Sequence, residues 1–255
     1  MTNKEILEIA MKQSALDINA TAEDFTKAEN IFVKSGLGPL ARKYYSEPIT
    51  CNMVSYGNNI VASVVDEYRD LVKEYLEKFT WYHCFETPNM HWLNEKLLER
   101  NQKVCFMAEY FLPDVEKIKR LPCKYELKVL EQKDFENLYL PEWSNALCEK
   151  CRELDILGVG AYHEGKLVGF AACSADCESM WQIGVDVLPE YRRQGIASAV
   201  TSNLAMEVLE RSKVPFYCSA WSNLKSVRNA LKSGFLPTWV EMTVKPADVV
   251  DEMNK

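Results

Sequence analysis

Short apolar or alternating runs recur through residues 125–244 and predict the strands of a sheet. Side chains alternate between the two faces of a strand, and residues 180–187 follow this period of two. A tight hairpin turn is expected at residues 163–166, between two apolar runs. The expected strands are residues 125–129, 156–162, 167–173, 180–187, 216–220 and 236–244.

Helices are expected between these strands, where apolar residues recur every three or four positions. One helix covers residues 196–211, and its buried stripe consists of Ile196, Val200, Leu204 and Val208. A second helix covers residues 224–233 and is closed by Gly234. Residues 133–150 are also expected to be helical, with a break near Pro141.

Residues 1–122 carry weaker patterns and no chemical motif. An amphipathic helix is predicted over residues 4–17. The later elements are expected in the order strand 51–56, strand 60–64, helix 65–79, short strand 83–85, helix 91–99 and strand 103–111.

A highly charged run at residues 114–120, followed by Pro122, indicates a connection between two domains. We therefore predict a smaller α/β domain over residues 1–122 and a second domain over residues 123–255. Hairpins and crossovers are mixed in the second domain, which predicts an α+β fold with a mixed central sheet and flanking helices.

Composition excludes several classes of protein. The chain has 255 residues and a formal net charge of −7, without a dense basic cluster, so we expect no nucleic-acid partner. No apolar run reaches the roughly 20 residues that span a bilayer, and residues 1–9 lack the apolar core of a signal peptide. We expect a cytoplasmic protein that does not enter membranes.

The nine cysteines are odd in number and scattered, which favours reduced thiols over a disulfide framework. Only Cys148 and Cys151 have the spacing of metal ligands, and no second pair completes a site, so we expect no metal.

The candidate chemistry lies where a strand ends and a helix begins, at residues 192–197. Backbone amides in the first turn of a helix lack intrahelical partners and bind phosphate well. Gly195 lets a phosphate approach the backbone, and Arg192 and Arg193 supply positive charge. The alternative is a surface turn whose arginines meet solvent.

This segment resembles the acetyl-CoA signature of the GNAT superfamily of N-acetyltransferases, with Arg192, Gly195 and Ala197 in the defining positions. A looser motif of the family is matched by Asn223, Ser226 and the pair at 234–235. The resemblance implies a V-shaped opening between strands 180–187 and 216–220 that receives acetyl-CoA. The cofactor-binding residues it implies are Val185, Val187, Arg192, Arg193, Gln194, Gly195, Ile196, Ala197, Ser198 and Asn223.

The resemblance implies direct attack of a primary amine, on a small molecule or a peptide, on the acetyl thioester. Candidate bases are Asp186 and Glu178, either of which could instead be a solvated carboxylate at a strand end. Many members carry a tyrosine acid where this chain has Ala230, which leaves the acid unassigned, with Ser226 and Tyr217 as candidates.

Three functions remain open from the sequence, of which the third is an interaction protein whose residues 192–197 bind another nucleotide. The first is an N-acetyltransferase, and similar proteins are commonly homodimers. The second is a non-catalytic acyl-CoA sensor, which the missing tyrosine would suit. Residues 1–122 resemble a degenerate GNAT-like half that lacks a phosphate turn, the name used here for residues 192–197. In this half Asn89 precedes a helix, as Asn223 does in the second domain.

Overall fold

The computed structural model describes residues 1–45 and 49–255 and divides into two compact units. Unit 1 contains residues 1–9 and 110–237, and unit 2 contains residues 10–109 and 238–255. This division differs from the predicted boundary at residue 122, because the last strand of the chain contributes most of its length to unit 2.

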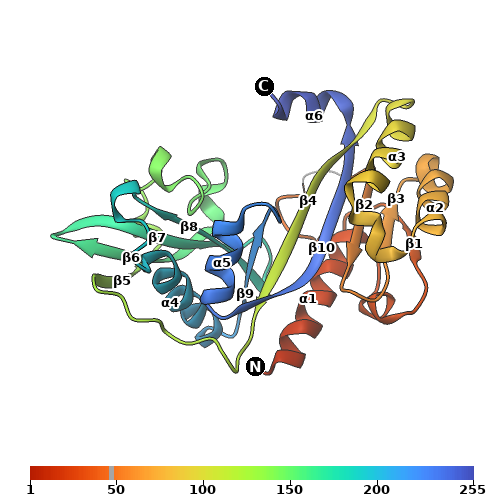
Figure 1. The fold of residues 1–255 in the computed structure, drawn as a ribbon. Coiled ribbons are helices and arrows are strands. Elements are labelled where there is room, and N and C mark those ends of the chain that lie inside the picture. Colours follow the sequence, from red (N-terminus) through yellow and green to blue (C-terminus); the bar gives the residue numbers. More distant parts are fainter. Residues whose placement is uncertain (46–48) are drawn as a thin grey trace. The chain divides into compact units, whose positions relative to one another are not determined.

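Unit 1 is built on a mixed sheet with the strand order β4-β9-β8-β7-β6-β5 (Figure 1). Strands β5 to β8 are antiparallel neighbours, whereas β8 and β9 are parallel. Glu164 and Gly165 have positive φ and form the predicted hairpin turn between β6 and β7. The strands are β4 (Gln102–Pro113), β5 (Glu126–Glu131), β6 (Asp155–His163), β7 (Lys166–Ser174), β8 (Met180–Val187) and β9 (Val214–Ser219).

Two helices pack in unit 1, α4 (Ile196–Glu210) and α5 (Leu224–Lys232). The predicted stripe of α4 is confirmed, since its four members are at most 1% exposed. It packs on the side chains of β6 and β7, including Val159 and Ala171, and this cluster forms the core of the unit. The predicted α+β fold with a mixed, helix-flanked sheet is therefore confirmed.

The helix predicted over residues 133–150 is wrong. The segment forms three short 3-10 turns, η4 (Gln132–Asp134), η5 (Pro141–Trp143) and η6 (Glu149–Leu154). Its apolar residues still reach a core, where Phe135 and Trp143 pack against Phe170 of β7. A regular helix does not form for two reasons. A proline stands at the start of η5 and has no backbone N–H to donate. Several backbone amides of the segment donate to carboxylates and not to helical carbonyl groups.

Unit 2 has the strand order β1-β3-β2-β10-β4. Strand β1 is parallel to β3, and β2 is antiparallel to both β3 and β10. One face of its sheet packs an apolar core against α2 and α3. Its further elements are α1 (Asn3–Ile18, begun in unit 1), η1 (Ala22–Thr26), β1 (Ile31–Lys34), β2 (Cys51–Ser55), β3 (Val61–Val64), η2 (Asp66–Tyr68), α2 (Arg69–Lys78), η3 (Trp81–Phe85), α3 (Thr87–Leu98), β10 (Phe235–Pro246, begun in unit 1) and α6 (Ala247–Met253).

Two expectations for this region are wrong. Residues 83–85 belong to η3 and not to a strand, because His83 and Glu86 donate backbone hydrogen bonds to residues three positions earlier. Asn89 lies inside α3, where its side chain donates to the His83 carbonyl at 2.9 Å. Strand β1 was not expected from the sequence. The likeness of residues 1–122 to a degenerate half domain stays a prediction.

The opposite face of the unit 2 sheet holds buried charge. Arg42 is fully buried, and its guanidinium lies 3.1 Å from Asp17 and 3.5 Å from Glu241. Trp239 donates its indole N–H to Glu241 at 2.8 Å. Buried ions require partners, so this cluster fixes residues 40–45 to the sheet.

None of the nine cysteines, all of which lie among the described residues, forms a disulfide. Over residues 1–45 and 49–255, no helix combines the length and apolar character needed to cross a bilayer.

Candidate functional site

Strands β8 and β9 separate along their length. Their parallel register runs from Met180 opposite Val214 to Ile183 opposite Tyr217 and then stops. On its other side β8 stays paired with β7 up to Val187, which lies opposite Gly169. The edge of residues 184–187 that faces β9 therefore has no strand beside it. Its backbone groups are available to an extended ligand, in the way that an added strand would use them.

The turn after β8 leads into a helix start without a side-chain cap. Gly195 is the N-cap of α4, with φ of 82°, a left-handed conformation that glycine adopts without strain. The first helical hydrogen bond runs from Ala199 N to Gly195 O, so the amides of residues 196–198 have no intrahelical partner. Such amides, together with the helix dipole, can bind an anion, and Ile196 lies beside Val187 at the end of β8.

Gly169 sets how closely this helix start approaches the sheet. A Cβ atom on Gly169 would lie 2.3 Å from Cγ2 of Ile196 and 3.4 Å from Cγ2 of Val187. The first residue of α4 thus packs directly on the backbone of β7. A larger residue at position 169 would force the Ile196 side chain, or the helix start that carries it, to move.

Three predicted residues of the turn lie on the surface and differ in their contacts. Arg192 donates from Nε to the Val187 carbonyl at 3.0 Å, so the terminal amino groups of its guanidinium face solvent. Arg193 has a left-handed backbone, with φ of 61°, and an exposed side chain. Gln194 accepts a hydrogen bond from the Tyr125 hydroxyl at 2.8 Å, which ties the turn to the start of β5.

Residues at the start of α5 lie next to the last paired position of β9. Asn223 caps α5 by accepting a hydrogen bond from Ser226 N at 3.3 Å. The Ser226 hydroxyl lies 2.7 Å from the Tyr217 hydroxyl. Burial raises the pKa of Tyr217 above its usual value, so this phenol stays protonated near neutral pH.

The two predicted bases lie at opposite ends of β8. Asp186 accepts hydrogen bonds from Asn145 N, Asn145 Nδ2 and Ala146 N, at 2.6 to 3.0 Å. Its carboxylate therefore anchors the turn after η5. Glu178 is exposed and precedes β8, at the end where β8 and β9 are still paired. The structure brings Asp186 to the open edge and keeps Glu178 away from it.

The family model for GNAT acetyltransferases matches residues 67–238, which is well over half of the chain. The chain belongs to the GNAT acetyltransferase family. The match begins within the predicted N-terminal domain, so the family's shared region includes α2, α3 and β4. Members of this family transfer an acyl group from acyl-CoA, and membership supports an acyltransferase activity for this protein.

Solved structures with similar folds include other GNAT proteins. One from Streptococcus suis is 22% identical, with a TM-score of 0.45 over 69% of this chain and 75% of that chain. One from Colwellia psychrerythraea is 15% identical, with a TM-score of 0.45 over 73% and 77%. One from Novosphingobium aromaticivorans is 19% identical, with a TM-score of 0.41 over 56% and 66%. Among curated proteins no match was found.

The GNAT site fits an acyl-CoA in two respects. The uncapped amides of residues 196–198 offer donors to a pyrophosphate, and the unpaired edge of residues 184–187 offers donors and acceptors to an amide-containing arm. Within the described residues, no three His, Cys, Asp or Glu side chains gather as a metal site.

Three residues beside this candidate site carry no signal in the sequence. Gly169 and Tyr125 hold the phosphate turn in place, and Lys232 at the end of α5 has its Nζ 3.9 Å from the position that a Cβ on Gly195 would occupy. A glycine in a hairpin strand and a lysine in a helix carry no motif. Only the folded arrangement shows their neighbours.

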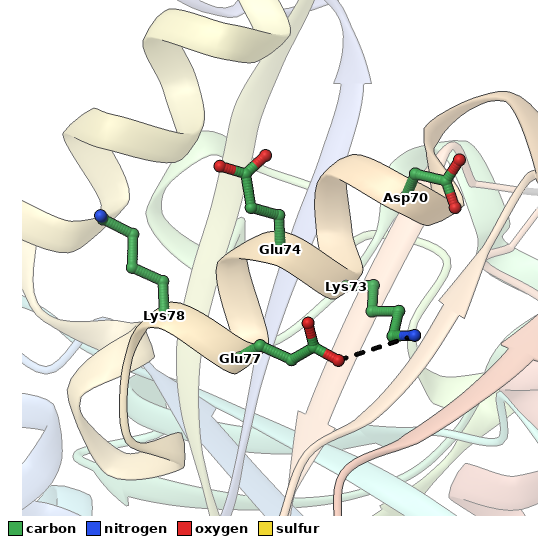
Figure 2. Close-up of a pocket in the computed structure, with 5 residues that line it drawn as sticks. All are labelled: Asp70, Lys73, Glu74, Glu77 and Lys78. Carbon is green, nitrogen blue, oxygen red and sulfur yellow. Dashed lines mark ion pairs between the residues drawn. The ribbon is translucent and has the colours of Figure 1, made fainter.

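A surface hollow of about 520 Å³ lies elsewhere, on α2 of unit 2 (Figure 2). Its lining side chains are all exposed, and Lys73 pairs with Glu77 at 3.6 Å. Charges of both signs at helical spacing are typical of a solvated helix face, so we assign no function to it. The lining residues are Asp70, Lys73, Glu74, Glu77 and Lys78.

Proposed function

We propose that this GNAT protein is an N-acetyltransferase that moves an acetyl group from acetyl-CoA to a primary amine of a small molecule or a peptide. The observation that carries the proposal is the unpaired edge of β8 beside the uncapped start of α4. One feature suits an extended polar arm and the other suits a pyrophosphate, and acetyl-CoA contains both groups in sequence. The net charge of −7 favours a cationic acceptor.

The phosphate turn would hold the cofactor through backbone amides of residues 195–198 and the guanidinium groups of Arg192 and Arg193. Arg192 is pre-oriented by its hydrogen bond to the Val187 carbonyl, which lies at the end of the open edge. The backbone of residues 185–187 would orient the arm. These contacts would place the reactive end of the cofactor further into the opening, toward the last paired residues Ile183 and Tyr217.

Acetyl-CoA supplies a thioester, whose acyl carbon forms a bond to the amine nitrogen as its bond to sulfur breaks. The amine must lose a proton and the sulfur must gain one. We assign proton donation to the Ser226–Tyr217 pair, in which the half-buried serine hydroxyl is the outer group and the buried phenol, 2.7 Å away, resupplies it. Such a relay would serve in place of the tyrosine acid that Ala230 replaces.

Asp186 keeps its place as a candidate base, but its contacts favour a positioning role. A carboxylate that accepts hydrogen bonds from two backbone amides and a side-chain amide is held to its turn. Glu178 would need an acceptor that extends along the whole of β8. The cytosol is the expected location, since free thiols persist in a reducing compartment.

A turnover assay tests the proposal. Purified protein is mixed with acetyl-CoA and a panel of primary amines, and released thiol is measured together with acetylated product by mass spectrometry. We expect product with at least one amine, and a kcat about tenfold lower in Ser226→Ala and Tyr217→Phe. The thiol's ordinary pKa of about 8.5 limits the loss, because thiolate leaves tolerably without an acid.

A non-catalytic acyl-CoA sensor is the second candidate, favoured by Ala230 and by the engaged carboxylate of Asp186. Binding of acetyl-CoA without acetylation of any amine or peptide in the panel would support the sensor. Absence of acetyl-CoA binding by folded protein would contradict both functions.

A further inference from the structure

Lys232 lies beside the phosphate turn but belongs to a different helix. It is the last residue of α5, and its Nζ is 3.9 Å from where a Cβ of Gly195 would stand. Gly195 is the N-cap of α4, the residue from which the uncapped amides begin. The ammonium group of this exposed lysine therefore lies close to the start of α4.

The fold fixes the backbone at this point. Ser233, the residue after Lys232, is buried and donates from Oγ to the Ser198 carbonyl at 3.4 Å. One turn earlier, Asn229 donates to Thr201 Oγ1 at 3.1 Å. Both bonds join the end of α5 to the first turns of α4. Only the side chain of Lys232 is left to adjust to a ligand.

The charges around the turn are unbalanced. Lys232, Arg192 and Arg193 make no ion pair with a carboxylate in the described chain, although many other lysines and arginines of this acidic protein do. Lys166 pairs with Glu190, the acidic side chain of the turn, at 3.3 Å. Arg192 and Arg193 thus stand in the turn before the uncapped amides, and Lys232 lies beside Gly195. A doubly charged pyrophosphate bound at the helix start would offset these positive charges.

We propose that Lys232 binds the pyrophosphate of the acyl-CoA together with the start of α4, and so determines specificity for CoA thioesters over thioesters that lack the diphosphate. This inference rests on the proposed function, since it requires acyl-CoA at the same site. The competing explanation is that Lys232 only interacts with the C-terminal dipole of its own helix.

The test is calorimetric binding of three ligands that differ in phosphate. Acetyl-CoA carries the pyrophosphate and a 3′-phosphate, acetyl-dephospho-CoA carries the pyrophosphate alone, and acetyl-pantetheine carries neither. Lys232→Gln should lower the affinity for acetyl-CoA and for acetyl-dephospho-CoA by the same factor, about fivefold to tenfold. Its affinity for acetyl-pantetheine should be unchanged. Lys232→Arg should retain most of the affinity.

Lys225→Gln is the matched control. Lys225 is exposed on the same helix, seven residues away or about 10 Å along its axis, and loses the same charge. We expect wild-type affinity for all three ligands.

Three results would overturn the role of Lys232. They are unchanged acetyl-CoA affinity in Lys232→Gln, a loss confined to the ligand with a 3′-phosphate, and an equal loss for acetyl-pantetheine, which would indicate a structural defect. If folded wild type binds no acetyl-CoA, the proposed function fails first and the inference fails with it.

Discussion

Gly169 offers a direct test of how the phosphate turn is positioned. In Gly169→Ala, the new methyl group would lie 2.3 Å from Cγ2 of Ile196, where carbon atoms normally approach to 3.5–4.0 Å. Ile196 is 1% exposed, so its side chain is enclosed by the core. Either this side chain or the start of α4 must then move by about 1 Å or more. We expect a loss of unfolding free energy near the upper end of the usual 1–3 kcal/mol for overpacking.

A double-mutant cycle isolates this contact. Ile196→Ala removes Cγ2 and should cost about 2–5 kcal/mol by itself, since it leaves a cavity. In the double variant the alanine methyl occupies part of that cavity. Its cost should therefore be smaller than the sum of the single costs by about 1–2 kcal/mol. Equilibrium urea unfolding measures the stabilities, and calorimetry measures acetyl-CoA affinity, which we expect to fall about tenfold in Gly169→Ala.

Gly38→Ala is the control, because the nearest heavy atom to its added methyl is 3.9 Å away. Its stability should stay within about 0.5 kcal/mol of wild type. Additive costs in the Gly169 and Ile196 cycle would refute the reasoning. A destabilised Gly169→Ala variant with unchanged acetyl-CoA affinity would show that the helix start need not hold its place for binding.

Three further predictions concern single residues. Gly195→Glu should abolish measurable acetyl-CoA binding in calorimetry, whereas Gly195→Asn, which tolerates the left-handed backbone, should keep part of it. Asp186→Asn should lower the unfolding free energy by about 1–3 kcal/mol, because Asp186 accepts hydrogen bonds from two backbone amides. The pH–rate profile should not shift. A shifted profile would support Asp186 as the base. Burial raises the pKa of Asp155 to about 6. The folded state therefore holds this proton more tightly than the unfolded chain does. The contribution of this carboxyl group to stability should decline as pH rises from about 4 to 6. In thermal unfolding across this pH range, the Tm of Asp155→Asn should rise relative to the Tm of wild type. A difference in Tm that stays constant with pH would contradict the raised pKa of Asp155.

The sequence predicted the elements whose signals are local. The stripe of α4 and the glycine before it follow from helical periodicity and from the conformational freedom of Gly195, and the structure has both. Residues 133–150 carried a similar spacing of apolar positions. There, however, Asp186 and Asp155 accept hydrogen bonds from the backbone amides of residues 145, 146 and 148. The spacing of apolar residues within a segment does not indicate such partners outside it.

Side-chain roles were harder to predict for the same reason. Asp186 was expected at the cofactor strand, but its engagement by Asn145 depends on how a separate segment folds over β8. The sequence offers Ser226 and Tyr217 as alternatives for one role, whereas the structure joins their hydroxyl groups. Lys232 was not considered, because its proximity to Gly195 depends on the packing of α5 against α4.

The division of unit 2 between two stretches of chain has a consequence for synthesis on the ribosome. Strand β2 pairs with Val240–Val244 of β10, and the whole of residues 110–237 is translated between them. Until residue 244 emerges, β2 keeps one edge open to other chains. Nearly all of unit 1, by contrast, is one continuous stretch. The order of maturation should therefore run against the order of translation, with unit 1 completed before the unit whose strands were made first.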